Sequence, residues 1–215
     1  VPNGAWIPPA PGSGSSLANL RRDRGVGEGE FLLVFAGNLN ALQGLDLLLG
    51  LLARPDLRGI RGWIIGEGRE RAEWQRRALT LGARVEFLGA LSEQETASHL
   101  QASQGAVAPY RADDYARIGG GHCSLKVLSA LACDRPLLVT DAPGLESLRE
   151  IPSVTLVAAG DTQGWADALC ARVEEWRRAV RCGWGLLLVL SVAFNLLARF
   201  ELYAETHGTL GSVLF

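Results

Sequence analysis

Short apolar runs alternate with longer amphipathic stretches from Phe31 onward. The apolar runs predict strands at 31–36, 62–65, 84–88, 105–108, 137–140 and 154–157. The amphipathic stretches predict helices at 42–53, 70–81, 93–102, 125–132, 145–149 and 163–180. Strands that alternate with helices in this way form parallel sheets. We therefore expect a doubly wound, Rossmann-like α/β domain over residues 31–181, with a mostly parallel six-stranded sheet and helices on both faces.

The two ends of the chain lack this alternation. Residues 1–30 are rich in Pro, Gly, Ser and Arg without a sustained apolar period, which predicts a linker. Residues 182–215 form a predicted apolar helical tail of uncertain origin, interrupted at Ser191 and Asn195. Its apolar run is about at the lower limit of the roughly 17 to 25 residues that span a bilayer. We therefore favour burial against another domain over a membrane segment, with an altered reading frame or a truncated gene as a third explanation.

Composition and charge narrow the classes of function. A net charge of -2 and a pI near 6.0 give no broad cationic field, so we expect no nucleic-acid partner. The four cysteines and three histidines show no spacing typical of a metal site, a disulfide framework or a catalytic triad. The chain begins at Val1, contains no Met and starts without a signal-peptide pattern. We expect a fragment of a cytoplasmic protein, with peripheral membrane contact left open.

The loop after the first predicted strand is a candidate phosphate site. Ligands of doubly wound sheets bind outside the carboxyl ends of the strands. Here Gly37 and Asn38 lead through Gln43 into an apolar helix. Glycine lets the backbone approach a ligand closely, and the free N–H groups of a helix start suit a phosphate. An ordinary tight turn is the alternative.

The next two loops carry weaker signals. Gly66 begins a Gly-x-Gly turn, but Arg71 stands where a dinucleotide fingerprint needs its third glycine. This departure weakens an NAD-binding interpretation. Leu88 and Gly89 precede a small turn whose backbone could meet a flat base edge. A plain connection between strand and helix explains that turn equally well.

The loop after the fourth predicted strand ends at the only lysine in the chain. It contains the glycines 119–121 and closes with Ser124, a residue type that caps helices, and Leu125. Lys126 would then place an ammonium beside the positive end of a helix, which is unfavourable unless an anion lies between them. The alternative is a solvated lysine on an exposed face.

Several blocks of sequence occur in an order that resembles a known family. The blocks are 1–4, 35–38, 43–46, 65–68, 85–89, 124–126 and 130–136. Together they resemble the carboxyl-terminal, donor-binding domain of retaining glycosyltransferases of the family-4, or group 1, type, which have the GT-B fold. The resemblance covers roughly residues 1–150, and the succession of blocks at βα spacing makes it specific.

The resemblance implies one Rossmann-like half of a GT-B enzyme. Its donor would be a nucleotide diphosphate sugar, bound without a metal or another cofactor. The acceptor is unknown and would be held by a missing N-terminal domain. Lys126 matches the lysine of the family's Pro-x-Lys-like block and is the candidate catalytic residue, holding the diphosphate. The donor-binding candidates are Gly37, Asn38, Gln43, Gly66, Leu88, Gly89, Ser124, Leu125 and Ser129.

The sequence also departs from the family at five of its positions. Asn38 and Gln43 stand where an Arg and a Lys commonly meet the diphosphate. Gly121 and Ser129 stand where many members carry two glutamates, the second of which contacts the ribose. Asp134 replaces a usual glycine. These departures motivate an alternative, a catalytically silent nucleotide-binding or scaffold domain, whereas the missing third glycine disfavours a Rossmann oxidoreductase.

Overall fold

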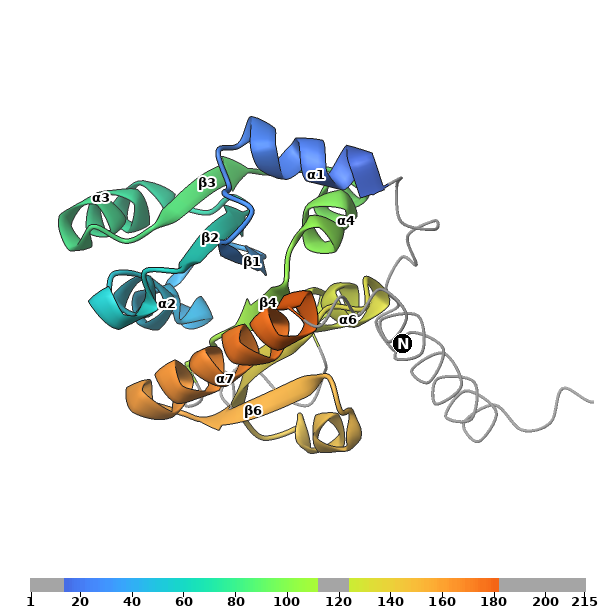
Figure 1. Ribbon diagram of the computed structural model, residues 1–215. Helices are drawn as coiled ribbons and strands as arrows, with labels where there is room; N and C mark the ends of the chain where they lie inside the picture. Colours follow the sequence, from blue (N-terminus) through green and yellow to red (C-terminus); the bar gives the residue numbers. More distant parts are fainter. Residues whose placement is uncertain (1–13, 112–123, 182–215) are drawn as a thin grey trace, which may run out of the picture. The chain divides into compact units, whose positions relative to one another are not determined.

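The computed structural model describes residues 14–111 and 124–181, whose described strands form a single parallel sheet (Figure 1). The strands are β1 (Phe31–Ala36), β2 (Ile60–Ile65), β3 (Val85–Gly89), β4 (Gly105–Ala108), β5 (Leu137–Asp141) and β6 (Val154–Ala158). Their order across the sheet is β3-β2-β1-β4-β5-β6, and every neighbouring pair is parallel. The strand order therefore reverses beside β1, which pairs with β2 on one side and β4 on the other. Ligands bind at such switch points in doubly wound sheets.

The helices follow the strands as the alternating pattern predicts. The helical segments are α1 (Gly14–Asp23), η1 (Ala41–Gln43), α2 (Leu45–Leu52), η2 (Pro55–Leu57), α3 (Arg71–Leu81), α4 (Glu93–Ala102), α6 (Leu125–Ala132), η3 (Glu146–Glu150) and α7 (Thr162–Arg181). The chain divides into two compact units, Val1–Val173 and Glu174–Phe215. The first holds the whole sheet, and in the second the structure describes only the end of α7.

Both faces of the sheet are covered, because alternate residues of a strand point to opposite sides. On one face, Val34 of β1 lies in a core cluster with Leu100 of α4 and Val127 of α6. On the other face, Gly62 of β2 lies directly against Leu52 of α2. The domain is therefore a doubly wound α/β fold with helices on both faces, as expected from the sequence.

The segment predicted as a linker includes a helix, α1, and this part of the prediction is wrong. Arg21 at the end of α1 donates hydrogen bonds to the carbonyl of Ala102 at 3.0 Å and to Oε1 of Gln104 at 2.7 Å. It also donates to the carbonyl of Glu30 at 2.9 Å, and Val26 is buried in the core. Leu17 and Leu20 of α1 also pack against the core cluster, but two leucines in a polar segment are too few to show a helical period in the sequence. Residues 1–13 and the tail at 182–215 lie outside the described residues.

Local signals in the sequence set most of the other boundaries. Ser92 and Glu95 form the expected capping box, in which the Ser92 hydroxyl accepts from the Glu95 N–H and the Glu95 carboxylate accepts from the Ser92 N–H. The helix predicted over 42–53 is divided into η1 and α2, because Gly44 between them has a φ of 63°. The short helix predicted at 145–149 is the 3-10 segment η3.

Asp134, just beyond α6, is the only non-glycine residue of the described ranges with a positive φ, 56°. A side chain in this left-handed conformation costs free energy that glycine avoids. We expect Asp134→Gly to raise the free energy of unfolding by about 0.5–1 kcal/mol in urea denaturation. The matched reverse substitution is Gly82→Asp, since Gly82 ends α3 at a φ of 65° with no atom near its missing side chain. It should lower stability by a similar amount, and a loss of stability in both variants would contradict the argument.

Candidate functional site

A cavity of about 580 Å³ opens at the carboxyl ends of the central strands. It is lined by the ends of β1 and β2, the segment after β3, Tyr110 after β4, and residues of α4 and α6. This is the place where the strand order reverses, and the volume lies within the roughly 300–1,000 Å³ typical of small-ligand pockets. The cavity can therefore hold a small organic ligand.

The floor of the cavity consists of backbone segments that touch one another. The N–H of Gly37 donates to the carbonyl of Ile65 at 2.9 Å, and the N–H of Gly66 donates to the carbonyl of Gly89 at 2.7 Å. Gly66 has a φ of 132°, and a Cβ at this position would overlap with the carbonyl oxygen of Gly37. Two loops can approach this closely only because Gly66 has no side chain.

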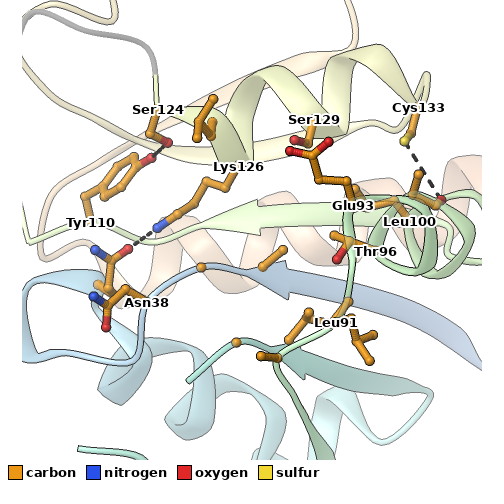
Figure 2. Close-up of a pocket in the computed structure, with 18 of the residues that line it drawn as sticks. Asn38, Leu91, Glu93, Thr96, Leu100, Tyr110, Ser124, Lys126, Ser129 and Cys133 are labelled. Carbon is orange, nitrogen blue, oxygen red and sulfur yellow. Dashed lines mark hydrogen bonds between the residues drawn. The ribbon is translucent and has the colours of Figure 1, made fainter. Parts of the chain in front are cut away.

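Lys126 extends across the cavity from the first turn of α6 (Figure 2). Its ammonium donates a hydrogen bond to Oε1 of Gln43. It also lies 4.8 Å from the ring centre of Phe35 and 4.6 Å from that of Tyr110. A Cβ on Gly37 would lie 3.0 Å from Cε of Lys126, so the lysine passes directly over the loop after β1. One lysine therefore joins elements that follow β1 and β4.

The environment of Lys126 stabilises its neutral form. Burial lowers the pKa of the Lys126 ammonium from its ordinary 10.5 to about 7. Two aromatic faces attract the cation but replace little of its lost hydration, and no carboxylate of the described ranges pairs with it. An anion in the cavity would supply the missing opposite charge and raise this pKa again.

The start of α6 offers a second feature that suits an anion. Ser124 occupies the expected N-cap position but makes no capping hydrogen bond to the helix. Its hydroxyl is instead hydrogen-bonded to the hydroxyl of Tyr110. The start of α6 therefore has no side-chain cap, and its first residues, Leu125 and Lys126, line the cavity at the positive end of the helix dipole.

The structure brings most of the predicted site residues together. The predicted residues that line the cavity are Gly37, Asn38, Gln43, Gly66, Ser124, Leu125, Lys126 and Ser129. Leu88 and Gly89 do not line it, and the following residues Ala90 and Leu91 do. The prediction was displaced because β3 continues through Gly89, so that the loop begins later than expected. Gly121 lies outside the described residues.

Three polar residues of the cavity were not predicted from the sequence. Tyr110 lies directly after β4, and Glu93 and Thr96 lie on α4. The only sequence feature that could have indicated them is that each lies in a segment after a predicted strand, where ligands of such sheets bind. Within residues 14–111 and 124–181, no group of three or more His, Cys, Asp or Glu side chains is arranged to hold a metal ion. None of the helices in these ranges is long and apolar enough to cross a membrane.

Comparison with known proteins gives one family. Residues 30–175 match the family described as glycosyl transferases group 1. The D-inositol 3-phosphate glycosyltransferase of Pseudarthrobacter chlorophenolicus is 30% identical over 165 residues, which are 72% of this chain and 37% of the relative. The enzyme of the same name from Nocardia farcinica is 30% identical over 173 residues, 77% of this chain and 38% of the relative. The chain thus spans well under half the length of these curated relatives.

Solved structures share the fold at lower sequence identity. WaaG, a glycosyltransferase involved in lipopolysaccharide biosynthesis, superposes with a TM-score of 0.69 at 18% identity, over 97% of this chain and 52% of WaaG. HepE from Anabaena, solved in complex with UDP and glucose, gives a TM-score of 0.65 at 21% identity, over 97% of this chain and 56% of HepE. At these identities the two structures show that the fold is shared.

Proposed function

The chain belongs to the group 1 glycosyltransferases, and from this premise we propose that its cavity is the donor site for a nucleotide diphosphate sugar. The observation that carries the proposal is the position of Lys126, which crosses the cavity beside the uncapped start of α6. A partly buried cation that no carboxylate of the described ranges pairs with and a helix start without a side-chain cap together suit a diphosphate.

In this site the diphosphate replaces Oε1 of Gln43 as the hydrogen-bond acceptor of Lys126. Its oxygens accept hydrogen bonds from the Lys126 ammonium and from the first amides of α6. The side-chain amides of Asn38 and Gln43 can donate further hydrogen bonds, because both residues line the cavity. Two neutral amides replace two cations here, so Lys126 supplies most of the positive charge.

The same contacts favour sugar transfer. When the bond between sugar and diphosphate breaks, negative charge grows on the bridging oxygen of the leaving group. Amides and an ammonium that are already in position stabilise this charge more than they stabilise the ground state. No metal ion is needed in this scheme. We propose transfer with retention of configuration, to an acceptor held by an N-terminal domain outside these 215 residues.

The apolar side of the cavity is suited to a nucleobase. Ala90 and Leu91 follow β3, and Leu100 faces the cavity from α4. Such a wall can cover the flat faces of a base while backbone groups meet its polar edge. The structure of HepE in complex with UDP supports this assignment by its shared fold. The family match and the two glycosyltransferase relatives do not favour the catalytically silent alternative.

Calorimetric titration of the complete 215-residue chain tests the proposal. We expect UDP, GDP or ADP to bind at one site, and the matching nucleotide sugar to compete for it. NAD serves as the control, because it also carries a diphosphate but would require a dinucleotide fingerprint. A folded chain that binds none of the three diphosphates, or that binds NAD equally well, would overturn the assignment.

A further inference from the structure

Among the described residues that line the cavity, Glu93 is the only one with a carboxylate. It lies in the first turn of α4, and Thr96 lies three residues later on the same face of the helix. Figure 2 shows the Glu93 carboxylate directed toward Ser129 of α6. Lys126 enters the cavity one helical turn before Ser129. The cavity therefore has a cation, Lys126, near the start of α6. Farther along α6, the hydroxyl of Ser129 faces the carboxylate of Glu93 and the hydroxyl of Thr96, which come from α4.

The Glu93 side chain is exposed in the unliganded domain, and no polar contact of the described residues fixes its position. The capping box of α4 is completed by Ser92 and Glu95, so Glu93 is not needed as a cap. Within the described ranges no hydrogen bond or ion pair engages its carboxylate. The remaining structural role is a favourable interaction with the dipole of α4, which any acidic residue in the first turn provides wherever its side chain points.

We infer that Glu93 accepts hydrogen bonds from the ribose hydroxyls of the donor, assisted by the hydroxyls of Thr96 and Ser129. A carboxylate would repel a diphosphate, so it must meet a part of the ligand that carries hydrogen-bond donors. The neighbouring diol of a ribose provides two, and a hydrogen bond to a charged acceptor is roughly twice as strong as a neutral one. Ser129 alone offers no charge. The carboxylate that orients the ribose thus comes from α4, across the cavity, and not from α6.

This inference rests on the proposed nucleotide site, and ligands that differ only in the ribose test it separately. UDP, GDP and ADP are compared with their 2′,3′-dideoxy forms in wild type, Glu93→Ala and Glu93→Gln. We expect both variants to bind the best ribonucleoside diphosphate roughly 10- to 100-fold more weakly, as for a lost charged hydrogen bond. Affinity for the dideoxy form should stay the same in all three proteins. A merely structural role would lower both affinities together.

Two further variants complete the experiment. Glu73→Ala removes an exposed acid from the first turn of α3, away from the cavity, and should leave both affinities unchanged. Ser129→Glu in the Glu93→Ala background moves the carboxylate to the facing helix and should restore discrimination between the ribose and dideoxy ligands. If wild type binds a diphosphate but Glu93→Ala keeps its full preference for ribose, this inference alone is overturned. If wild type binds no diphosphate, the proposed function falls with it.

Discussion

Gly66→Ala is expected to lower the free energy of unfolding by roughly 3 kcal/mol or more and to abolish ligand binding. At a φ of 132° an alanine is strained whatever space surrounds it. In addition, its Cβ would overlap with the carbonyl oxygen of Gly37, which is backbone and cannot rotate away. The loops after β1 and β2 would have to separate, and they form the floor of the cavity. Denaturation in urea measures the first effect and calorimetric titration with UDP, GDP and ADP the second.

Gly82→Ala is the matched control for this substitution. Gly82 also has a positive φ, 65°, but a Cβ there would meet no atom within 4 Å. It should therefore cost only the conformational term, about 1 kcal/mol, and leave binding unchanged. If both variants lost the same free energy of unfolding, the close contact between Gly66 and Gly37 would not contribute to stability.

The fold could be predicted from the sequence wherever a local pattern has one structural meaning. Buried parallel strands need continuous apolar runs, so β1 and β4 have the predicted bounds. The capping box fixed the start of α4 in the same way. In contrast, α1 depends on long-range contacts, among them the hydrogen bonds from Arg21 and the packing of Leu17 and Leu20 on the core, and no local sequence pattern predicts these. Gly44 shows a third case, because a glycine within a helical pattern can continue or divide the helix.

For the candidate site, too, the sequence predicted which loops come together but not how the side chains pack around them. Chain order and strand ends placed Gly37, Gly66 and Lys126 near one another, since the carboxyl ends of parallel strands share one edge. Which face of α4 borders the cavity depends on how that helix packs, so Glu93 could not be found from its spacing. The sequence suggested that Lys126 lies beside the amides of its own helix. It could not show that the ammonium also meets Gln43 from the loop after β1.

The free energy that Lys126 costs the unliganded domain follows from its pKa. Folding lowers the pKa from its ordinary 10.5 to about 7, so the unfolded chain binds more protons between these two values. The stability of the unliganded protein should therefore rise with pH across this range. Below about pH 7 the full penalty remains, at most about 5 kcal/mol by the relation of 1.36 kcal/mol per tenfold change in proton affinity. A residue that destabilises the free protein this strongly indicates a ligand that uses its charge.

Lys126→Met is accordingly expected to change stability and binding in opposite directions. Methionine fills similar space without a charge, so unfolding at about pH 6 should cost about 2–4 kcal/mol more than in wild type, after the loss of the hydrogen bond to Gln43. The difference should shrink as the pH rises toward 10.5. Affinity for the nucleotide sugar should fall roughly 10- to 100-fold at about pH 6, because the diphosphate loses its main cation. A variant that is both less stable and unchanged in binding would remove Lys126 from the site.

The pH dependence of binding distinguishes the loss of the positive charge of Lys126 from the loss of its side-chain contacts. A nucleotide sugar is the suitable ligand, because each of its phosphorus atoms carries one ester bond, one anhydride bond and a single strongly acidic oxygen, whose charge stays constant near neutral pH. Since the diphosphate binds the protonated lysine, wild-type affinity should fall above about pH 7, up to about tenfold per pH unit, and approach that of Lys126→Met. The Lys126→Met variant itself should bind equally at each pH.

Lys126→Arg is the charged control. It keeps its charge throughout this range, so any affinity it retains should also be independent of pH. If wild-type affinity shows no decline between about pH 7 and pH 9 and equals that of Lys126→Met throughout, the ammonium does not bind the diphosphate.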